Sequence, residues 1–438
     1  QIKRFCRGNA DRFSLVRVFL SAIIMNDNSG AFEIKNVVLR DIESVLRQRI
    51  GDHMIIENYT SKSLLPPGEN YGSSIFSVDV ELKDKNTEKK EDLHLIAKMC
   101  PPTEYQREIF NSSRTFIKEI FMYETILPAY NKLELECGLR KNEVFDILPK
   151  FYGSRLSLQP DGEFDDDAVI LMENLKIEGY YTGDRAIGYD LEHAEEAVKA
   201  LARFHALGIA TKEKRPGIFE VFKMYARPLQ NTNGNADNMF TLVLDQIKND
   251  PEISPYYERC AKILTDLKME DLWADTLREP WTSIIHSDFW VNNVMFHRSE
   301  KGKIDGVKFV DFQIYLYGSP LRDLLFFLYS SVKNDVTEEQ IDNLLDLYYE
   351  TFINTLSKMG CNTNLYTKEG FKEKLAEDAE REFIHVSWMI KVLTLDTKEI
   401  ENFDVDKMQS VFVGLNGNQL FKDRLRRLVL VFVKRNWI

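Results

Sequence analysis

The stretch over residues 284–323 constrains this chain more than any other. His286, Asp288 and Asn293 follow one another within one predicted loop, and a later apolar run ends at Asp311. The apolar runs around these residues predict short strands, which would place the polar side chains at strand ends. An Asp and an Asn on one loop, with a second Asp after the next strand, are the parts that phosphoryl transfer requires.

Each of these residue types has a chemical task in that reaction. A carboxylate must accept or orient the proton of the attacking hydroxyl, and oxygen ligands must hold Mg²⁺ against the nucleotide phosphates. We therefore predict that Asp288 is the catalytic base and that Asn293 and Asp311 bind Mg²⁺. The alternative is a buried polar turn whose Asp and Asn only cap backbone amides. His286 is expected to be structural.

A lysine in an apolar strand is the second signal. Residues 93–99 read as a strand, and Lys98 lies on the same face as His94 and Ile96. An unpaired buried ammonium group is costly, whereas in a kinase-type lobe such a lysine contacts the α- and β-phosphates and pairs with a helix Glu. The alternative is an edge lysine whose ammonium group reaches water. We predict that Lys98 binds the nucleotide.

The expected partner of Lys98 lies on a long helix predicted over residues 103–127, which Pro128 should end. Glu119 is the first candidate, and Glu124 remains a competitor. A third interpretation is that the Glu is only a solvated residue of the helix, since such residues are common there.

A loop rich in small residues precedes Lys98. Residues 66–74 contain Gly and Ser, and the next residues, 76–82, alternate apolar and polar side chains as a strand does. Because Gly lets backbone N–H groups approach phosphates closely, Gly72 and Ser73 are predicted to cover the nucleotide. An ordinary hairpin turn is the alternative, but the position of the loop before Lys98 favours the binding role.

Charge and cysteine content exclude several classes of protein. The chain carries 57 Lys and Arg against 69 Asp and Glu, a net charge of −12, so we expect no nucleic-acid partner. Its five cysteines are scattered and odd in number, which indicates neither a zinc site nor a disulfide framework. A reducing, cytoplasmic location is the simplest interpretation. No apolar run approaches the length of a membrane span.

The remaining chain divides into a first part with strands and a later, mostly helical part. The strands are predicted over residues 53–65, 76–82, 93–99, 144–158 and 167–173. The helices are predicted over 33–50 and 103–127, over a core segment that follows Leu191 and ends at Gly208, and over 324–358, 370–395 and the tail 408–436. The acidic turn from Asp161 to Asp167 is expected to be solvated rather than a metal site.

These residues carry a resemblance to a known family. The chain resembles the insect ecdysteroid-kinase-like, or CHK kinase-like, family, which is related to choline kinases and aminoglycoside phosphotransferases. The matching stretches are PPGENYGSSIFSV (66–78), HLIAKMCPP (94–102), FIKEIFMYETILP (116–128), VILMENL (169–175), ALARFHALG (200–208), HSDFWVNNVMF (286–296), VDFQ (310–313) and SPLRDLLFFL (319–328). Two residues depart from the wider kinase pattern. Ser287 stands where many relatives have Gly, and Gln313 stands where protein kinases have the Gly after Asp-Phe, although Gln is normal there in the insect family.

The resemblance implies a fold and a nucleotide site. The fold would be α+β and bilobal, like that of protein kinases, with a small N-lobe of antiparallel sheet and helix and a large, mostly helical C-lobe. The N-lobe would span residues 25–175 and the C-lobe 176–438. ATP and Mg²⁺ would bind between the lobes, with backbone groups of Glu173, Asn174 and Leu175 against the adenine.

The resemblance also implies a small-molecule kinase whose acceptor is a hydroxyl of an ecdysteroid or another hydroxylated lipophilic compound. Protein kinases carry a Lys two residues after the catalytic Asp, where this chain has Trp290, and the path from Asp311 to Asp323 leaves no room for a peptide platform. Two alternatives stay open, a nucleotide-binding pseudokinase and a choline- or ethanolamine-type kinase. The sequence leaves open the identity of the acceptor and the oligomeric state.

The first residues share no motif with this core. Residues 1–24 carry basic side chains followed by an apolar run that Arg17 interrupts, so a signal peptide is the weaker interpretation and an extension before a start at Met25 the stronger one. We predict that a chain lacking residues 1–24 keeps its melting temperature and its ATP turnover. A large loss of either quantity would instead show that the segment packs on the N-lobe.

Overall fold

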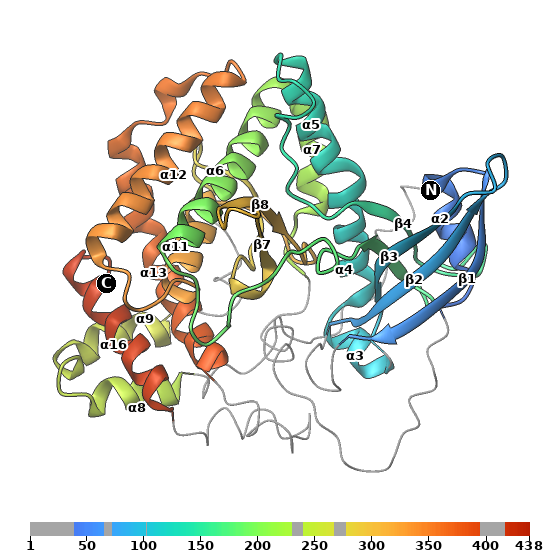
Figure 1. Cartoon of the computed structure of the whole chain (residues 1–438). Coiled ribbons are helices and arrows are strands. Elements are labelled where there is room, and N and C mark those ends of the chain that lie inside the picture. The colour runs from blue at the N-terminus through green and yellow to red at the C-terminus, as the bar shows by residue number, and fades with distance from the viewer. Residues whose placement is uncertain (1–38, 65–71, 102, 230–239, 267–276, 395–416) are drawn as a thin grey trace, which may run out of the picture.

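The computed structural model describes residues 39–64, 72–101, 103–229, 240–266, 277–394 and 417–438. The fold is α+β, as predicted, with an antiparallel sheet at one end and a large helical part at the other (Figure 1). The predicted extension over residues 1–24 lies outside the described residues. So do most of the loop before Gly72 and the first part of the predicted 408–436 tail.

The sheet of the N-lobe has five strands in the order β1-β2-β3-β5-β4, and all neighbouring pairs are antiparallel. The strands are β1 (Met54–Ser63), β2 (Ser74–Asp84), β3 (Lys90–Met99), β4 (Phe151–Arg155) and β5 (Val169–Glu173). The predicted strand over 144–158 is too long, because residues 144–150 form no strand. These residues instead contact the C-lobe, where the Ile147 carbonyl accepts a hydrogen bond from the backbone N–H of Phe309 at 2.7 Å.

The two faces of this sheet pack against different helices. One face carries Val78, Leu95 and Leu171 and packs against α2 (Ile42–Ile50). The other face carries Ile170 and Met172, which join a cluster with Phe116 of α4 (Ser112–Phe121). The predicted helix over 33–50 is shorter among the described residues, because Asp41 caps the first turn of α2 by accepting a hydrogen bond from the backbone N–H of Ser44. Residues 33–38 lie outside the described part.

The helix predicted over 103–127 is broken near its start and continues past its predicted end. It consists of α3 (Glu104–Ile109), α4 (Ser112–Phe121), the π-helical turn η1 (Met122–Ile126) and α5 (Leu127–Glu136). The prediction that Pro128 ends the helix is wrong, because Pro128 stands in the first turn of α5. A proline is tolerated there, since the wider preceding turn accommodates the missing N–H.

The C-lobe holds the remaining helices and two short antiparallel pairs of strands. The helices are α6 (Leu191–Lys214), α7 (Pro216–Tyr225), α8 (Thr241–Asn249), α9 (Tyr257–Asp266), α11 (Pro320–Ser330), α12 (Glu338–Lys358), α13 (Lys368–Thr394) and α16 (Gln419–Lys434), with the short turns η2 (Ser254–Tyr256), η3 (Val291–Asn293) and η4 (Thr363–Leu365). The pairs are β6 (Ser283–Ile285) with β9 (Leu316–Gly318), and β7 (Val294–Arg298) with β8 (Ile304–Phe309). The short strands predicted around the 284–323 stretch are thereby confirmed.

Gly208 does not end its helix, contrary to the prediction, because α6 continues to Lys214. The glycine serves close packing instead. A Cβ atom at Gly208 would lie 2.2 Å from the Ser283 hydroxyl oxygen and 2.9 Å from that of Tyr130. The missing side chain therefore lets β6, which leads into the catalytic loop, lie directly on α6.

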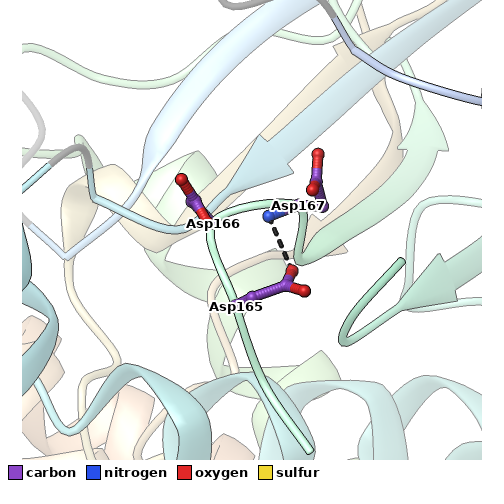
Figure 2. A group of neighbouring side chains, drawn as sticks. All are labelled: Asp165, Asp166 and Asp167. Atoms are coloured by element: carbon purple, nitrogen blue, oxygen red, sulfur yellow. Dashed lines mark hydrogen bonds between the residues drawn. The ribbon is translucent and has the colours of Figure 1, made fainter. Parts of the chain in front are cut away.

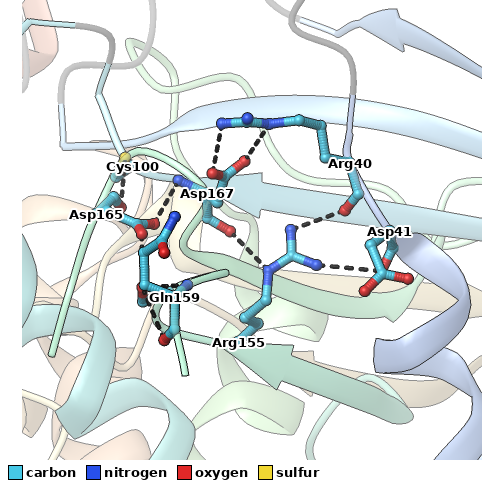
Figure 3. Close-up of polar contacts among 8 residues, drawn as sticks. Arg40, Asp41, Cys100, Arg155, Gln159, Asp165 and Asp167 are labelled. Carbon is cyan, nitrogen blue, oxygen red and sulfur yellow. Dashed lines mark hydrogen bonds and ion pairs between the residues drawn. The ribbon is translucent and has the colours of Figure 1, made fainter. Parts of the chain in front are cut away.

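The acidic turn is not simply solvated, contrary to the prediction. Oxygen atoms of Asp165, Asp166 and Asp167 lie within 4.8 Å of one another (Figure 2). Asp167 is buried, however, and both of its carboxylate oxygens accept hydrogen bonds from Arg40. Arg155 donates to the Asp167 carbonyl at 3.2 Å and to the Arg40 carbonyl at 2.8 Å (Figure 3). The turn thus anchors the start of α2 to the sheet edge.

The largest hydrophobic core spans more than the helical lobe. It contains the α6, α11, α12 and α13 side chains together with Met122, Ile126 and Tyr130 from the helix of the N-lobe. The predicted lobe boundary at residue 175 stays a prediction, since this core is shared across it. Among the described residues, no helix combines the length and apolar character that a bilayer crossing requires.

Glu134 joins the two lobes and yields a stability prediction. Its buried carboxylate accepts hydrogen bonds from the Arg203 guanidinium, at 2.9 Å from Nε, and from the backbone N–H of Phe145 at 2.7 Å. Because Glu134→Ala leaves the buried N–H of Phe145 and the partly exposed Arg203 guanidinium without this acceptor, it should lower the free energy of unfolding by about 2 kcal/mol. Urea denaturation measures the change.

The exposed Glu136 on the same helix is the matched control. Glu136→Ala should change the free energy of unfolding by less than about 1 kcal/mol, because surface ion pairs contribute little. Equal effects of the two substitutions would show that Glu134 does not join the lobes.

Candidate active site

The predicted catalytic loop, called the catalytic loop below, is the turn between β6 and β7. Asp288 follows β6, and Asn293 ends the short turn η3 directly before β7. The Asn293 side-chain nitrogen donates hydrogen bonds to the Asp288 carbonyl and to Asp288 Oδ2, both at 2.9 Å. The structure therefore brings these two predicted site residues into direct contact and orients the Asp288 carboxylate.

A buried carboxylate behind the loop holds its backbone in place. Asp323, in the first turn of α11, accepts hydrogen bonds from the backbone N–H of His286 at 2.6 Å and of Ser287 at 2.8 Å. His205 of α6 lies 3.1 Å from the same carboxylate. Although burial raises the pKa of Asp323, these hydrogen bonds and the neighbouring histidines hold it below its usual value. These contacts give Asp323 a supporting role beneath the loop.

Ser287 adopts a backbone conformation that glycine reaches more easily than other residues. Its φ angle is 70°, in the left-handed region that L side chains rarely adopt. Asp311 has a similar φ of 65°. Because such angles cost free energy and persist only where the surroundings enforce them, the Asp323 carboxylate serves as the local constraint for the Ser287 turn.

Lys98 connects the two lobes. Its Nζ atom lies 2.6 Å from Glu119 Oε2 and 2.7 Å from Asp311 Oδ1. Lys98 and Glu119 are both buried. Glu124, the competing partner, is exposed in the π-helical turn, so the structure pairs Lys98 with Glu119.

Burial and charge shift the pKa values of these groups strongly. Burial lowers the pKa of Lys98, but the charges of Asp311 and Glu119 outweigh it and hold the pKa above its usual value. Burial raises the pKa of Glu119 to about 7, with Lys98 opposing the shift. Burial and the nearby Asp311 charge raise the pKa of Asp288 to about 8. Such clustered shifts are typical of functional sites.

The residues present fit a divalent cation with oxygen ligands. Because the Asn293 amide nitrogen faces Asp288, its side-chain oxygen is left for another partner. The backbone N–H of Val310 donates to the Asn293 carbonyl at 3.0 Å, which brings Asp311 next to the loop. An amide oxygen beside a carboxylate is a donor set that Mg²⁺ accepts, usually together with phosphate oxygens.

The predicted phosphate loop is described only at its end. A Cβ atom at Gly72 would lie 3.3 Å from the Phe110 ring and 3.4 Å from the Gln313 side-chain oxygen. Ser73 is buried beside it. The end of the loop therefore lies against the segment that carries Asp311, while residues 65–71 lie outside the described part.

The segment predicted to contact adenine has its N–H groups engaged. The backbone N–H of Glu173 donates to the Lys150 carbonyl at 2.8 Å, that of Asn174 to the His94 carbonyl at 3.1 Å, and that of Leu175 to the Glu173 carbonyl at 3.1 Å. An adenine would therefore meet the carbonyl oxygens here, unless one of these hydrogen bonds is exchanged.

Two supporting residues carry no signal in the sequence. The Tyr189 hydroxyl lies 2.7 Å from the Val294 carbonyl, and the Ser331 hydroxyl accepts from the backbone N–H of Val291 at 3.0 Å. Both brace the end of the catalytic loop from distant segments. Only their burial, which depends on the tertiary structure, distinguishes them from other Tyr and Ser residues.

The comparison with known protein families agrees with this geometry. The model of the ecdysteroid kinase-like family matches residues 67–361, which is more than half of the chain. No curated protein matches. Among solved structures, an amicoumacin kinase in complex with AMP-PNP and Ca²⁺ is 12% identical with a TM-score of 0.42, covering 89% of this chain and 94% of that one.

Two further solved structures are similarly distant. A Plasmodium vivax ethanolamine kinase is 9% identical with a TM-score of 0.39, covering 99% of both chains. A microcompartment-associated aminopropanol kinase is 11% identical with a TM-score of 0.37, covering 87% of this chain and 95% of that one. These likenesses are too remote to transfer a ligand, whereas the family match covers the phosphate loop, Lys98, Glu119 and the catalytic loop. The chain belongs to the ecdysteroid kinase-like family and is a small-molecule phosphotransferase.

Proposed function

We propose that this protein transfers the γ-phosphate of ATP to a hydroxyl of a small lipophilic acceptor, an ecdysteroid or another hydroxylated compound. The observation that carries the proposal is the continuous polar chain from Glu119 through Lys98 to Asp311, next to the Asn293–Asp288 contact. Nucleotide binding and proton transfer require these groups in this order. The choice of a lipophilic acceptor rests on the family.

In the proposed reaction, the acceptor hydroxyl oxygen forms a bond to the γ-phosphorus while the bond to the β-phosphate oxygen breaks and ADP leaves. Asp288 takes the hydroxyl proton, because its orientation by Asn293 leaves Oδ1 without another hydrogen-bond partner among the described residues. Lys98 offsets the charge of the α- and β-phosphates and is held by Glu119. Mg²⁺ bound by Asn293 and Asp311 would supply further positive charge beside the phosphates.

A protein acceptor fits this site poorly. The segment after Asp311 enters β9, which pairs with β6, and Pro320 begins α11 directly afterwards. The chain therefore offers no extended activation segment between Asp311 and Asp323 on which a peptide could lie. Trp290 also replaces the lysine with which protein kinases contact the phosphate.

Substitutions at the two aspartates should separate chemistry from nucleotide binding. Asp288→Asn should lower kcat at least about a hundredfold while ATP still binds, because general-base contributions are of this size. Asp311→Asn should instead weaken Mg²⁺-dependent ATP binding. Steady-state kinetics and calorimetry measure the two effects.

Glu124→Gln is the matched control, since this exposed carboxylate lies on the same helix as Glu119 without contacting Lys98. It should leave both quantities close to wild type. Near-normal turnover in Asp288→Asn, or unchanged Mg-ATP affinity in Asp311→Asn, would contradict the assigned roles.

The acceptor class is tested with ATP labelled at the γ-phosphate. One pool contains sterol alcohols, plant phenols and amino alcohols, and a second pool contains proteins and peptides. The enzyme should label only the small molecules of the first pool. Labelling of amino alcohols alone would favour a choline- or ethanolamine-type kinase. Labelling of protein alone would overturn the proposal, and labelling of neither pool would indicate a pseudokinase.

A further inference from the structure

A cavity of about 610 Å³ is lined by residues from both the N-terminal and the C-terminal part of the chain. It is bounded by the helix η1–α5, the loop 145–150, the connecting residues near Glu173 and the β7–β8 hairpin. None of Lys98, Asp288 and Asp311 is among its lining residues, all of which belong to the described part of the chain. The cavity therefore excludes the catalytic groups and shares only Glu173 with the segment predicted to contact adenine.

Aromatic rings form part of its wall. Tyr123 and Phe151 stack with ring centroids 5.6 Å apart, and both line the cavity together with Phe145 and Tyr180. Ring faces attract cations, because the π-electrons carry negative charge above and below the ring. Two of the four rings already have a cation nearby, since Arg49 lies 5.5 Å from the centre of the Phe151 ring and Arg203 lies 5.0 Å from that of Phe145. Among the described residues no cation lies over Tyr123 or Tyr180, so these are the rings that an organic cation would contact.

Unsatisfied acceptors line the same cavity. The side-chain oxygen of Asn131 is buried and has no hydrogen-bond partner among the described residues. Glu178 is exposed at the cavity and forms no ion pair within the described part of the chain. The Glu173 carboxylate accepts a hydrogen bond from the backbone N–H of Lys150 at 3.1 Å. The unpaired amide oxygen of Asn131 carries partial negative charge, which attracts a cation whether or not that cation can donate a hydrogen bond.

The cations in the wall already have partners. Lys308 Nζ lies 2.7 Å from Asp146 Oδ1 and 2.9 Å from the Leu148 carbonyl. Lys150 Nζ lies 4.7 Å from the centre of the Tyr152 ring, and His297 contacts Asp305 at 2.6 Å.

The carboxylates around the cavity also affect the pKa of the Tyr180 phenol. Burial raises its pKa, and the carboxylates of Asp146, Glu173, Asp305 and Glu178 raise it further. Among the carboxylates that line the cavity, Asp146 is paired with Lys308, whereas Glu178 has no ion pair within the described part of the chain, so Glu178 is available to a cationic ligand.

We propose that this cavity binds a small organic cation of the alkylammonium class, which lies against the aromatic wall and is attracted by Glu178, Glu173 and Asn131. No phosphoryl transfer occurs there, because the groups of the candidate active site are absent from the wall. The proposal is independent of the acceptor class given above.

The position of the cavity couples it to the nucleotide site. Tyr123 lies one helical turn after Glu119, the partner of Lys98. On the other side, the Ile147 carbonyl accepts a hydrogen bond from Phe309 at 2.7 Å, at the end of the strand that leads to Asp311. An occupant touches both supports of the Lys98 ion pair, so its binding changes the affinity for ATP.

The test is calorimetric titration of the full chain with tetramethylammonium at constant ionic strength. Tert-butanol, which has a similar shape without the charge, is the ligand control. Saturable binding of tetramethylammonium and none of tert-butanol is expected. Glu178→Gln combined with Asn131→Leu should weaken the binding about tenfold, because each lost contact with a cation is worth roughly a few-fold in affinity.

Two further variants test whether the cation binds in this cavity rather than elsewhere on the chain. Glu163→Gln, at an exposed carboxylate away from the cavity, should leave the affinity unchanged, and Asp288→Asn should do so as well. Circular dichroism melting verifies that each variant is folded. Absent binding, equal binding of tert-butanol, an unchanged affinity in the double variant or a loss of binding in Asp288→Asn would each overturn the proposal.

A titration of ATP with and without saturating tetramethylammonium tests the coupling. The dissociation constant of ATP should change by at least about twofold, since coupling between sites is reciprocal. An identical dissociation constant would overturn the coupling and leave a binding site without regulatory effect.

Discussion

The buried carboxylate of Asp323 is the contact on which the catalytic loop depends. It accepts the backbone N–H groups of His286 and Ser287 and lies beside His205. A buried carboxylate is costly unless it is hydrogen-bonded, and here the loop supplies the donors. In return, the carboxylate holds Ser287 at a φ angle that it would otherwise avoid. Asp288 can then project from a turn that is rigid before any ligand binds.

The ion pairs of Lys98 fix the positions of three elements from the two lobes in a similar way. Glu119 comes from the helix beside the sheet, Lys98 from the sheet and Asp311 from the segment of the C-lobe that follows β8. Because all three are brought together by one ammonium group, a shift of any one element alters the site. The shared hydrophobic core, which includes Met122 and Tyr130, limits such shifts.

The errors of sequence reasoning have a common physical origin. Pro128 and Gly208 are usual places for helices to end, and both lie inside continuous helical segments here. At Pro128 a π-helical turn accommodates the missing N–H, and at Gly208 the absent side chain makes room for Ser283. Local propensity is overruled wherever packing stabilises the alternative more strongly. The local sequence pattern also predicts that the Asp167 carboxylate is solvated. That prediction fails because the partner of Asp167, Arg40, is distant in the sequence, and no local pattern reveals their contact.

The sequence by itself determined the parts of the site whose chemistry depends on short spacing. Asp288 and Asn293 lie on one loop, and the strand before Asp311 was readable from its apolar run, because side-chain alternation and loop length are local properties. Only the tertiary structure decided that Glu119 rather than Glu124 pairs with Lys98, because both lie on one helix and differ only in the direction they face. The bracing by Tyr189 and the cavity beside Glu178 likewise depend on segments far apart in the chain, whose meeting no local pattern encodes.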